Sequence, residues 1–187
     1  MRRICVFCGS ASGTDPGYAV AANELGTELA ARGIELVTGG GRVGLMGVVA
    51  DAALGAGGSV IGVIPRSLRD REIGHTGLTE LRVVESLHER KQLMHDLSDA
   101  FVALPGGFGT LDELAEAITW AQLGIHEKPI GLLDVGGYFE DLLAFVARAV
   151  ADGFVSPAHG AILTVARTPV EVLDRLATFR MPARKWA

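Results

Sequence analysis

Residues 34–64 read IELVTGGGRVGLMGVVADAALGAGGSVIGVI, and this stretch decides the fold. Residues 34–38 predict a strand, the three glycines that follow predict a turn, and residues 44–56 predict a helix. Residues 59–64 predict the next strand, and residues 60–64 are apolar without alternation. Strands of that kind are buried on both faces, as in a parallel sheet whose connecting helices make right-handed crossovers.

The same alternation of strand and helix continues in both directions along the chain. Further strands are expected at residues 3–8, 80–85, 100–104, 129–133 and 161–165, and further helices at residues 16–32, 87–97, 111–123, 138–151 and 169–178. A polar connection at 65–78 is the one long loop inside the pattern, and loops of that length are often functional. We therefore expect one α/β domain over residues 1–187, a Rossmann-like doubly wound parallel sheet. Ligands of such sheets bind beyond the carboxyl ends of the strands.

Composition narrows the classes of function. The chain has 187 residues, 49% of them apolar, and a net charge of −5, which disfavours a nucleic-acid or anionic-membrane partner. Apolar runs stay well below the roughly 20 residues of a membrane helix, so we predict a cytoplasmic protein. Cys5 and Cys8 have C-x-x-C spacing but fall within a predicted strand, which favours buried, reduced cysteines on opposite faces over a redox pair.

The glycine loop at residues 39–44 satisfies G-x-G-x-x-G between a strand and a helix, which is a weak signal alone. The next strand ends in Pro65-Arg66 without the acid of an NAD site, although an arginine could receive the 2′-phosphate of NADP. Close packing of helix on strand and contact with a mononucleotide remain the other interpretations. Gly40 and Gly41 here, with Gly9 and Ser10 after the first strand, are candidate nucleotide contacts.

A second glycine loop, LPGGFGTLDE at residues 104–113, is more informative. A strand, a glycine turn and a helix start leave amide N–H groups directed outward at the positive end of a helix dipole, which is an anion site. The loop lacks the G-K-[ST] of a P-loop, which argues against ATP hydrolysis. Thr110-x-x-Glu113 also fits a capping box, in which Glu113 would serve only the helix start.

A third element places cations near a helix start. Ser86-x-x-Glu89 predicts an N-cap, and Arg90 and Lys91 follow in the first turns. Cations there oppose the helix dipole by roughly 0.3–1 kcal/mol each, which a bound anion would offset. Met94 shares a face with Arg90 and would add an apolar wall. The alternative is that both cations are solvated surface charges.

These motifs resemble a known family. The sequence PGGFGTLDE at residues 105–113 resembles the PGGxGTxxE signature of the LONELY GUY (LOG) family, and ERKxxM at 89–94 is similar to its RK-containing helix. The blocks CVFCGS at 5–10, GGGxxGLMG at 39–47 and TWAQLGIHxKP at 119–129 resemble further family blocks. The resemblance extends from about residue 3 to about residue 156.

The resemblance implies a homodimeric enzyme that hydrolyses cytokinin riboside 5′-monophosphates, and often AMP, to the free base and ribose 5-phosphate. It implies that Arg90 and Glu113 are the catalytic pair. It also implies a set of substrate contacts, namely Glu72, Lys91, Gly106, Gly107, Gly109, Thr110 and Thr119. No cofactor and no metal is expected, because the five histidines form no ligand run.

Members of the family have long been labelled lysine decarboxylases, and the chain gives that label little support. It has three lysines, Lys91, Lys128 and Lys185, one of which would have to hold pyridoxal phosphate. In the favoured mechanism Glu113 stabilises an oxocarbenium-like ribose and Arg90 clamps phosphate or ribose. Glu72 is a candidate for protonating the departing base, since arginine is a poor acid. The rival interpretations are a nucleotide sensor without turnover and an NADP-linked oxidoreductase.

Overall fold

Apolar segments spaced along the chain form one parallel sheet in the computed structural model, which describes residues 1–69 and 74–183. Its strands are β1 (Arg3–Phe7), β2 (Glu35–Thr38), β3 (Val60–Pro65), β4 (Glu80–Val84), β5 (Ala100–Ala103), β6 (Ile130–Leu133) and β7 (Leu163–Ala166). They lie in the order β4-β3-β2-β1-β5-β6-β7, and every adjacent pair is parallel. The predicted doubly wound sheet is confirmed, and its order reverses between β1 and β5.

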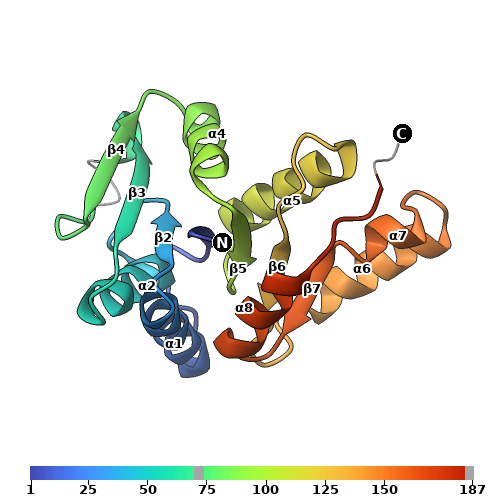
Figure 1. Cartoon of the computed structure of the whole chain (residues 1–187), viewed down its shortest axis with the longest axis horizontal. Helices are drawn as coiled ribbons and strands as arrows, with labels where there is room; N and C mark the ends of the chain where they lie inside the picture. The colour runs from blue at the N-terminus through green and yellow to red at the C-terminus, as the bar shows by residue number, and fades with distance from the viewer. Residues whose placement is uncertain (70–73, 184–187) are drawn as a thin grey trace.

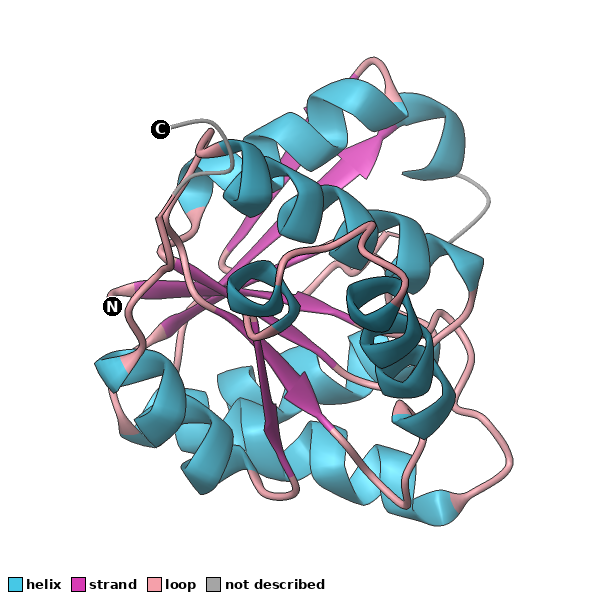
Figure 2. Cartoon of the chain, turned by 90° about the vertical axis from the view of Figure 1, so that its right-hand side faces the viewer, coloured by secondary structure: helices cyan, strands magenta, loops and turns pink. Residues whose placement is uncertain are grey.

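Helices cover both faces of this sheet (Figures 1 and 2). They are α1 (Pro16–Ala31), α2 (Gly44–Gly55), α3 (Arg66–Arg69), α4 (Leu87–Leu97), α5 (Phe108–Leu123), α6 (Glu140–Ala151), α7 (Pro157–Gly160) and α8 (Pro169–Thr178). In Figure 1, α4 and α5 lie above the sheet, and α1, α2 and α8 lie below it. Within the described ranges, no helix combines the length and the apolar character that crossing a bilayer requires.

The sheet separates two apolar clusters, one on each face. The side chains of β1 alternate between these clusters, because successive residues of a strand point to opposite faces of the sheet. Ile4 and Val6 pack with α1, α2 and α8, whereas Cys5 and Phe7 pack with α4 and α5. Cys8 belongs to the cluster opposite that of Cys5, as predicted, and both cysteines are free and buried. Burial raises the pKa of both thiols, so neither is a ready nucleophile.

The structure corrects several predicted bounds. Helix α5 begins at Phe108 where the sequence suggested residue 111, and α6 begins at Glu140 where it suggested residue 138. The expected loop at 65–78 begins with the short helix α3, and α7 is a further short helix before β7. Short single turns carry little hydrophobic periodicity, which is why the pattern did not show them.

The contact between α1 and α2 generates a prediction about stability. A Cβ at Gly26 would lie 2.4 Å from the Val49 carbonyl oxygen and 2.9 Å from the Ala52 Cβ. Gly26→Ala must therefore push the helices apart, and we expect urea unfolding to show a loss of about 1–3 kcal/mol. Gly55→Ala, which adds a methyl group in open space within α2, is the control and is expected to be neutral or stabilising. Equal effects of the two changes would contradict this account of the packing.

Candidate active site

The turns after β1, β2 and β5 meet at the carboxyl ends of the strands, where the sheet order reverses. The Gly9 N–H donates to the Pro105 carbonyl oxygen at 3.0 Å, and the Met46 N–H donates to the Gly9 carbonyl oxygen at 3.3 Å. Together with the first turn of α4, these turns line a cavity of about 190 Å³. Its lining consists of Cys8, Gly9, Ser10, Met46, Arg90, Gly107, Phe108, Gly109, Thr110 and Glu113. This is the switch-point crevice in which doubly wound sheets bind ligands.

The helix start beside this cavity has no side-chain cap. Its N-cap is Gly107, and it shares this lack with α2 and α6, whereas side chains cap α1, α4, α7 and α8. The first-turn N–H groups of a helix have no intrahelical acceptor and lie at the positive end of the dipole. Thr110 is the third residue of α5 and Glu113 lies in its second turn, so the capping box considered from the sequence is wrong. Glu113 therefore takes no part in capping α5.

Glu113 and Arg90 face each other across the cavity from different helices. Arg90 Nη2 lies 3.7 Å from Glu113 Oε1, and the side chains are only 9% and 14% exposed. A charge pair this buried interacts through a lower effective dielectric than a surface pair. The two predicted catalytic residues are thus brought together, with a carboxylate and a guanidinium on the wall of one cavity.

Space for the Arg90 side chain comes from Gly39, the first residue of the glycine turn after β2. A Cβ at position 39 would lie 1.9 Å from Arg90 Nη2, so any larger residue would displace the guanidinium. Among the described residues, the buried Arg90 Nε has no hydrogen-bond partner. The guanidinium therefore retains donor capacity beyond its pairing with Glu113.

Lys91 takes a different position from its neighbour. Its ammonium lies 3.0 Å from carboxylate oxygens of both Asp112 and Glu116, and so ties α4 to α5. Burial opposes the charge of Lys91, but the bonds to Glu116 and Asp112 outweigh it and raise the pKa of Lys91. The lysine thus stays charged and cross-links two helices.

The remaining predicted contacts are distributed around this centre. Gly106 lies immediately before the α5 N-cap. Met94 is buried in the apolar cluster between the sheet and helices α4 and α5. Gly40 and Gly41 are buried beside the start of α2. Thr119 is exposed on α5 and does not line the cavity, and Glu72 lies outside the described residues.

Sequence reasoning missed three residues that shape the cavity, namely Cys8, Met46 and Gly39. Cys8 was interpreted only as core, although it is the last residue before the first glycine turn. Met46 lies in the first turn of α2, and its sulfur accepts the Gly41 N–H at 3.1 Å. The signal for both was their position at a strand end or a helix start next to glycine.

Helix α4 carries Arg90 near its start, and an aromatic cluster anchors the C-terminal half of the same helix. The His95 ring lies 4.5 Å from the rings of both Phe101 and Trp120 and 5.5 Å from that of His126, measured between centroids. The Lys128 ammonium donates to the His95 carbonyl oxygen at 2.5 Å. Burial, with the nearby His126 and Lys128, lowers the pKa of His95 to about 4, and burial with Lys128 does the same for His126.

The described lysines do not fit a pyridoxal phosphate enzyme. Lys91 is bound to Asp112 and Glu116, and Lys128 is bound to the His95 carbonyl oxygen in the core. Lys185 lies outside the described residues. A Schiff-base lysine needs a free amine facing the cofactor, which neither described lysine offers.

The fold and the cavity define a Rossmann-like protein with an uncapped helix start and a buried arginine–carboxylate pair at its switch point. The family model described as "Possible lysine decarboxylase" matches residues 46–176. A probable cytokinin riboside 5′-monophosphate phosphoribohydrolase of Oryza sativa subsp. japonica is 54% identical over 178 residues, which cover 95% of this chain and 71% of the rice protein. A cytokinin riboside 5′-monophosphate phosphoribohydrolase of Arabidopsis thaliana is 52% identical over 178 residues, covering 95% and 84%. This chain belongs to their family, the LOG family of phosphoribohydrolases.

Solved structures show the same architecture. The molybdenum cofactor carrier protein of Chlamydomonas reinhardtii is 26% identical with a TM-score of 0.71, and the match covers 94% of this chain and 95% of that one. The molybdenum cofactor binding protein of Rippkaea orientalis is 24% identical with a TM-score of 0.72, over 94% and 95% of the two chains. At these identities the fold is shared, while the chemistry is decided by the site.

The histidine cluster generates a prediction about pH. The unfolded chain binds protons on His95 and His126 near pH 6.5, whereas the folded chain binds them only near pH 4. The stability is therefore fully present above about pH 6.5 and is lost as the pH falls toward 4. We expect the thermal midpoint to fall by several degrees between pH 7 and pH 5.

Removing one of the two titrating rings should weaken the dependence of the thermal midpoint on pH. We therefore expect His95→Gln to have a lower thermal midpoint than wild type at pH 7 but a smaller change between pH 7 and pH 5. The exposed His88 on the same helix supplies the control, since His88→Gln should keep the wild-type profile. A wild-type midpoint that is constant from pH 7 to pH 5 would refute the prediction.

Proposed function

We propose that this protein hydrolyses the N-glycosidic bond of cytokinin riboside 5′-monophosphates, and of AMP, to the free base and ribose 5-phosphate. The observation that carries the proposal is that Arg90 and Glu113 form a buried pair on the wall of the cavity into which the uncapped start of α5 opens. The rice and Arabidopsis relatives, which bear names for this reaction, support the same assignment.

The phosphate of the substrate binds at the start of α5. The N–H groups of residues 107–110 supply neutral donors at a dipole end, and Arg90 supplies a charged donor from α4. A 5′-phosphate held there places the ribose one to two helical turns along the cavity wall, where Glu113 lies. Lys91, Thr119 and Glu72 remain further proposed contacts of the nucleotide.

Glu113 acts on the sugar. As the C1′–N9 bond breaks, its electron pair moves to the base and positive charge develops on the ribose, which a nearby carboxylate stabilises. Water then supplies hydroxide to C1′ and a proton to the departing base, so that base and ribose 5-phosphate are the balanced products. Arg90 holds both the phosphate and the Glu113 carboxylate in register for this step.

The test incubates wild type and Glu113→Gln with AMP and with isopentenyladenosine monophosphate and measures the release of free base by chromatography. The substitution keeps the shape of the side chain but removes a charge needed chiefly in the transition state. We expect kcat to fall by roughly 10²–10³-fold while AMP still raises the thermal midpoint.

Glu24→Gln is the matched control, since it makes the same change at an exposed carboxylate on α1 that does not line the cavity, and it should keep kcat within about twofold. The corresponding nucleosides, which lack phosphate, should be cleaved at least 10²-fold less efficiently. Normal turnover by Glu113→Gln would remove Glu113 from the mechanism. A wild type that binds AMP but releases no base would identify a nucleotide sensor instead.

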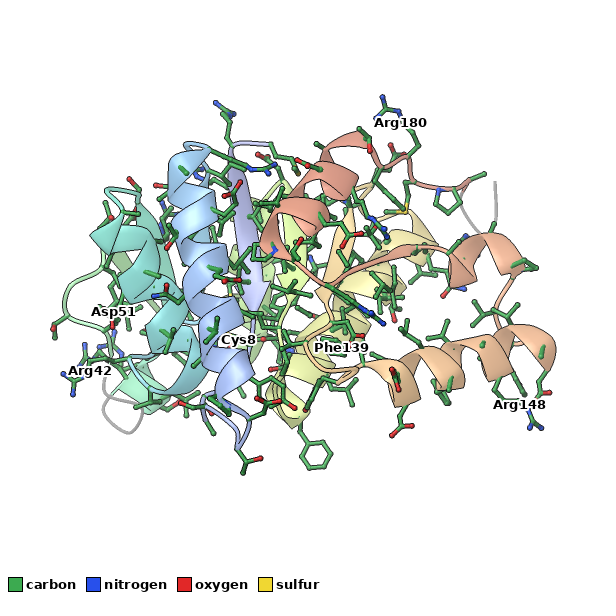
Figure 3. The ribbon with its side chains drawn as sticks, turned by 90° about the horizontal axis from the view of Figure 1, so that it is seen from below. Cys8, Arg42, Asp51, Phe139, Arg148 and Arg180 are labelled. Carbon is green, nitrogen blue, oxygen red and sulfur yellow. The ribbon has the colours of Figure 1, made fainter. Side chains whose placement is uncertain are left out.

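We also propose a cytoplasmic homodimer. Helix α6 has no fully buried residue in the described part of the chain: Leu142 and Leu143 pack against the core and are partly buried, whereas Phe145 is 69% exposed. Figure 3 shows α6 extending outward from Phe139 to Arg148 at the edge of the molecule. Apolar helical surface of this kind is typical of an interface, and a second copy of the chain is the proposed partner.

Light scattering at micromolar concentration should therefore give twice the mass of the chain. A charge placed in the apolar stripe, Phe145→Glu, should shift the protein toward the monomer because burying it in an interface is costly. Glu24→Lys, a charge reversal at an exposed position of α1, is the control and should keep the wild-type mass. A monomeric wild type would exclude the dimer.

A further inference from the structure

The turn that precedes the anion site is held by a side chain from outside the cavity. The Tyr138 hydroxyl donates to the Gly106 carbonyl oxygen at 2.5 Å. Tyr138 lies in the connection between β6 and α6, which follows the strand next to β5 in the sheet. The bond therefore joins the turn after β5 to the turn after its neighbour.

The β6–α6 connection is itself built to place this tyrosine. Gly136 and Gly137 have φ values of 63° and 78°, which side chains rarely adopt, and they turn the chain sharply. Buried Asp134 then accepts the Phe139 N–H at 2.9 Å. The Tyr138 ring is also held edge-on by the Tyr18 ring of α1, with centroids 5.6 Å apart.

The Gly106–Gly107 peptide needs an external anchor. A Cβ at Gly106 would lie 2.1 Å from Thr110 Oγ1 and 2.8 Å from the Gly9 nitrogen, so position 106 must be glycine. A peptide flanked by two glycines rotates at little cost, since neither residue has a side chain to restrict it. Rotation would exchange a donor for an acceptor at the mouth of an anion site.

Peptide planarity makes the Tyr138 bond consequential. In a trans peptide the C=O and the following N–H point in opposite directions. Gly107 and Tyr138 together line two neighbouring cavities of about 330 Å³ each, but only Gly107 also lines the cavity that holds Arg90 and Glu113. Holding the Gly106 oxygen toward Tyr138 therefore directs the Gly107 N–H away from Tyr138 and toward the phosphate site.

We infer that Tyr138 is a positioning residue for phosphate binding, whose hydroxyl keeps the Gly106 carbonyl out of the anion site and the Gly107 N–H in it. The inference rests on the proposed function for the identity of the anion, a sugar phosphate. It assigns Tyr138 no contact with the reacting atoms.

The test compares Tyr138→Phe with Tyr18→Phe, which removes the other tyrosine hydroxyl of the chain and retains the ring packing. Calorimetry with ribose 5-phosphate and with inorganic phosphate measures binding without turnover. We expect Tyr138→Phe to weaken both ligands by roughly 3- to 10-fold, the scale of one hydrogen bond. The KM for AMP should rise by a similar factor while kcat changes less than about twofold. Tyr18→Phe should leave all of these values unchanged.

A structural role alone would lower the thermal midpoint without selectively weakening phosphate. Wild-type affinity in Tyr138→Phe, or equal losses in both variants, would overturn the inference. If Tyr138→Phe folds poorly, the backbone amide resonance of Gly107 is measured in the wild-type protein instead. This resonance should shift when ribose 5-phosphate is added. An unchanged resonance would overturn the inference. A protein that binds ribose 5-phosphate, and binds it more weakly after Tyr138→Phe, but whose wild type releases no base refutes the proposed function and leaves this inference intact.

Discussion

The hydrogen bond from the Gly9 N–H to the Pro105 carbonyl oxygen closes the two turns at the reversal of the sheet, and the site is built around that contact. Strands β1 and β5 are neighbours in the sheet although some 90 residues separate them in the chain. The helices that follow these strands, α1 after β1 and α5 after β5, lie on opposite faces of the sheet. The two turns therefore diverge beyond the strand ends and leave a crevice between them. The contact between Gly9 and Pro105 forms the base of that crevice. The uncapped start of α5 and the first turn of α4 form its walls.

The second constraint is that several segments approach one another too closely to leave room for a Cβ atom, and a glycine stands at each of these positions. Gly39 leaves room for the Arg90 guanidinium, and Gly106 leaves room for the Thr110 hydroxyl. A Cβ at Gly44, where α2 begins with a φ of 62°, would lie 2.3 Å from the Ser10 carbonyl carbon. The glycine loops thus pack closely and also shape the cavity, so the close-packing interpretation of the sequence holds and is compatible with a nucleotide contact. Side chains at these positions would fill the cavity or move its charged residues.

The sequence predicted the sheet, the helices and the central pair, because these depend on local pattern and on motifs. Alternating apolar strands and helices imply a parallel sheet, and the glycine turns fall at strand ends. The start of α5 was predicted three residues late, since Phe108 is 93% exposed and adds nothing to the apolar periodicity. The role of Gly39 and the bond from Tyr138 to Gly106 link segments far apart in the chain. Such contacts depend on tertiary geometry, which propensity and spacing do not encode.

The two cations at the start of α4 show how the structure changes one step of the sequence argument. Arg90 and Lys91 oppose the dipole of their own helix, and a bound anion was the expected compensation. The structure compensates both with carboxylates from α5, Glu113 for Arg90 and Asp112 with Glu116 for Lys91. These acids lie beyond the first turn of α5, so they act on the two cations rather than on the dipole of their own helix. Successive residues of a helix differ by about 100° in direction, so one cation faces the cavity and the next ties the helices together. In the proposed mechanism phosphate therefore binds at the start of α5 and at the Arg90 guanidinium, while Lys91 ties together the two helices that carry Arg90 and Glu113.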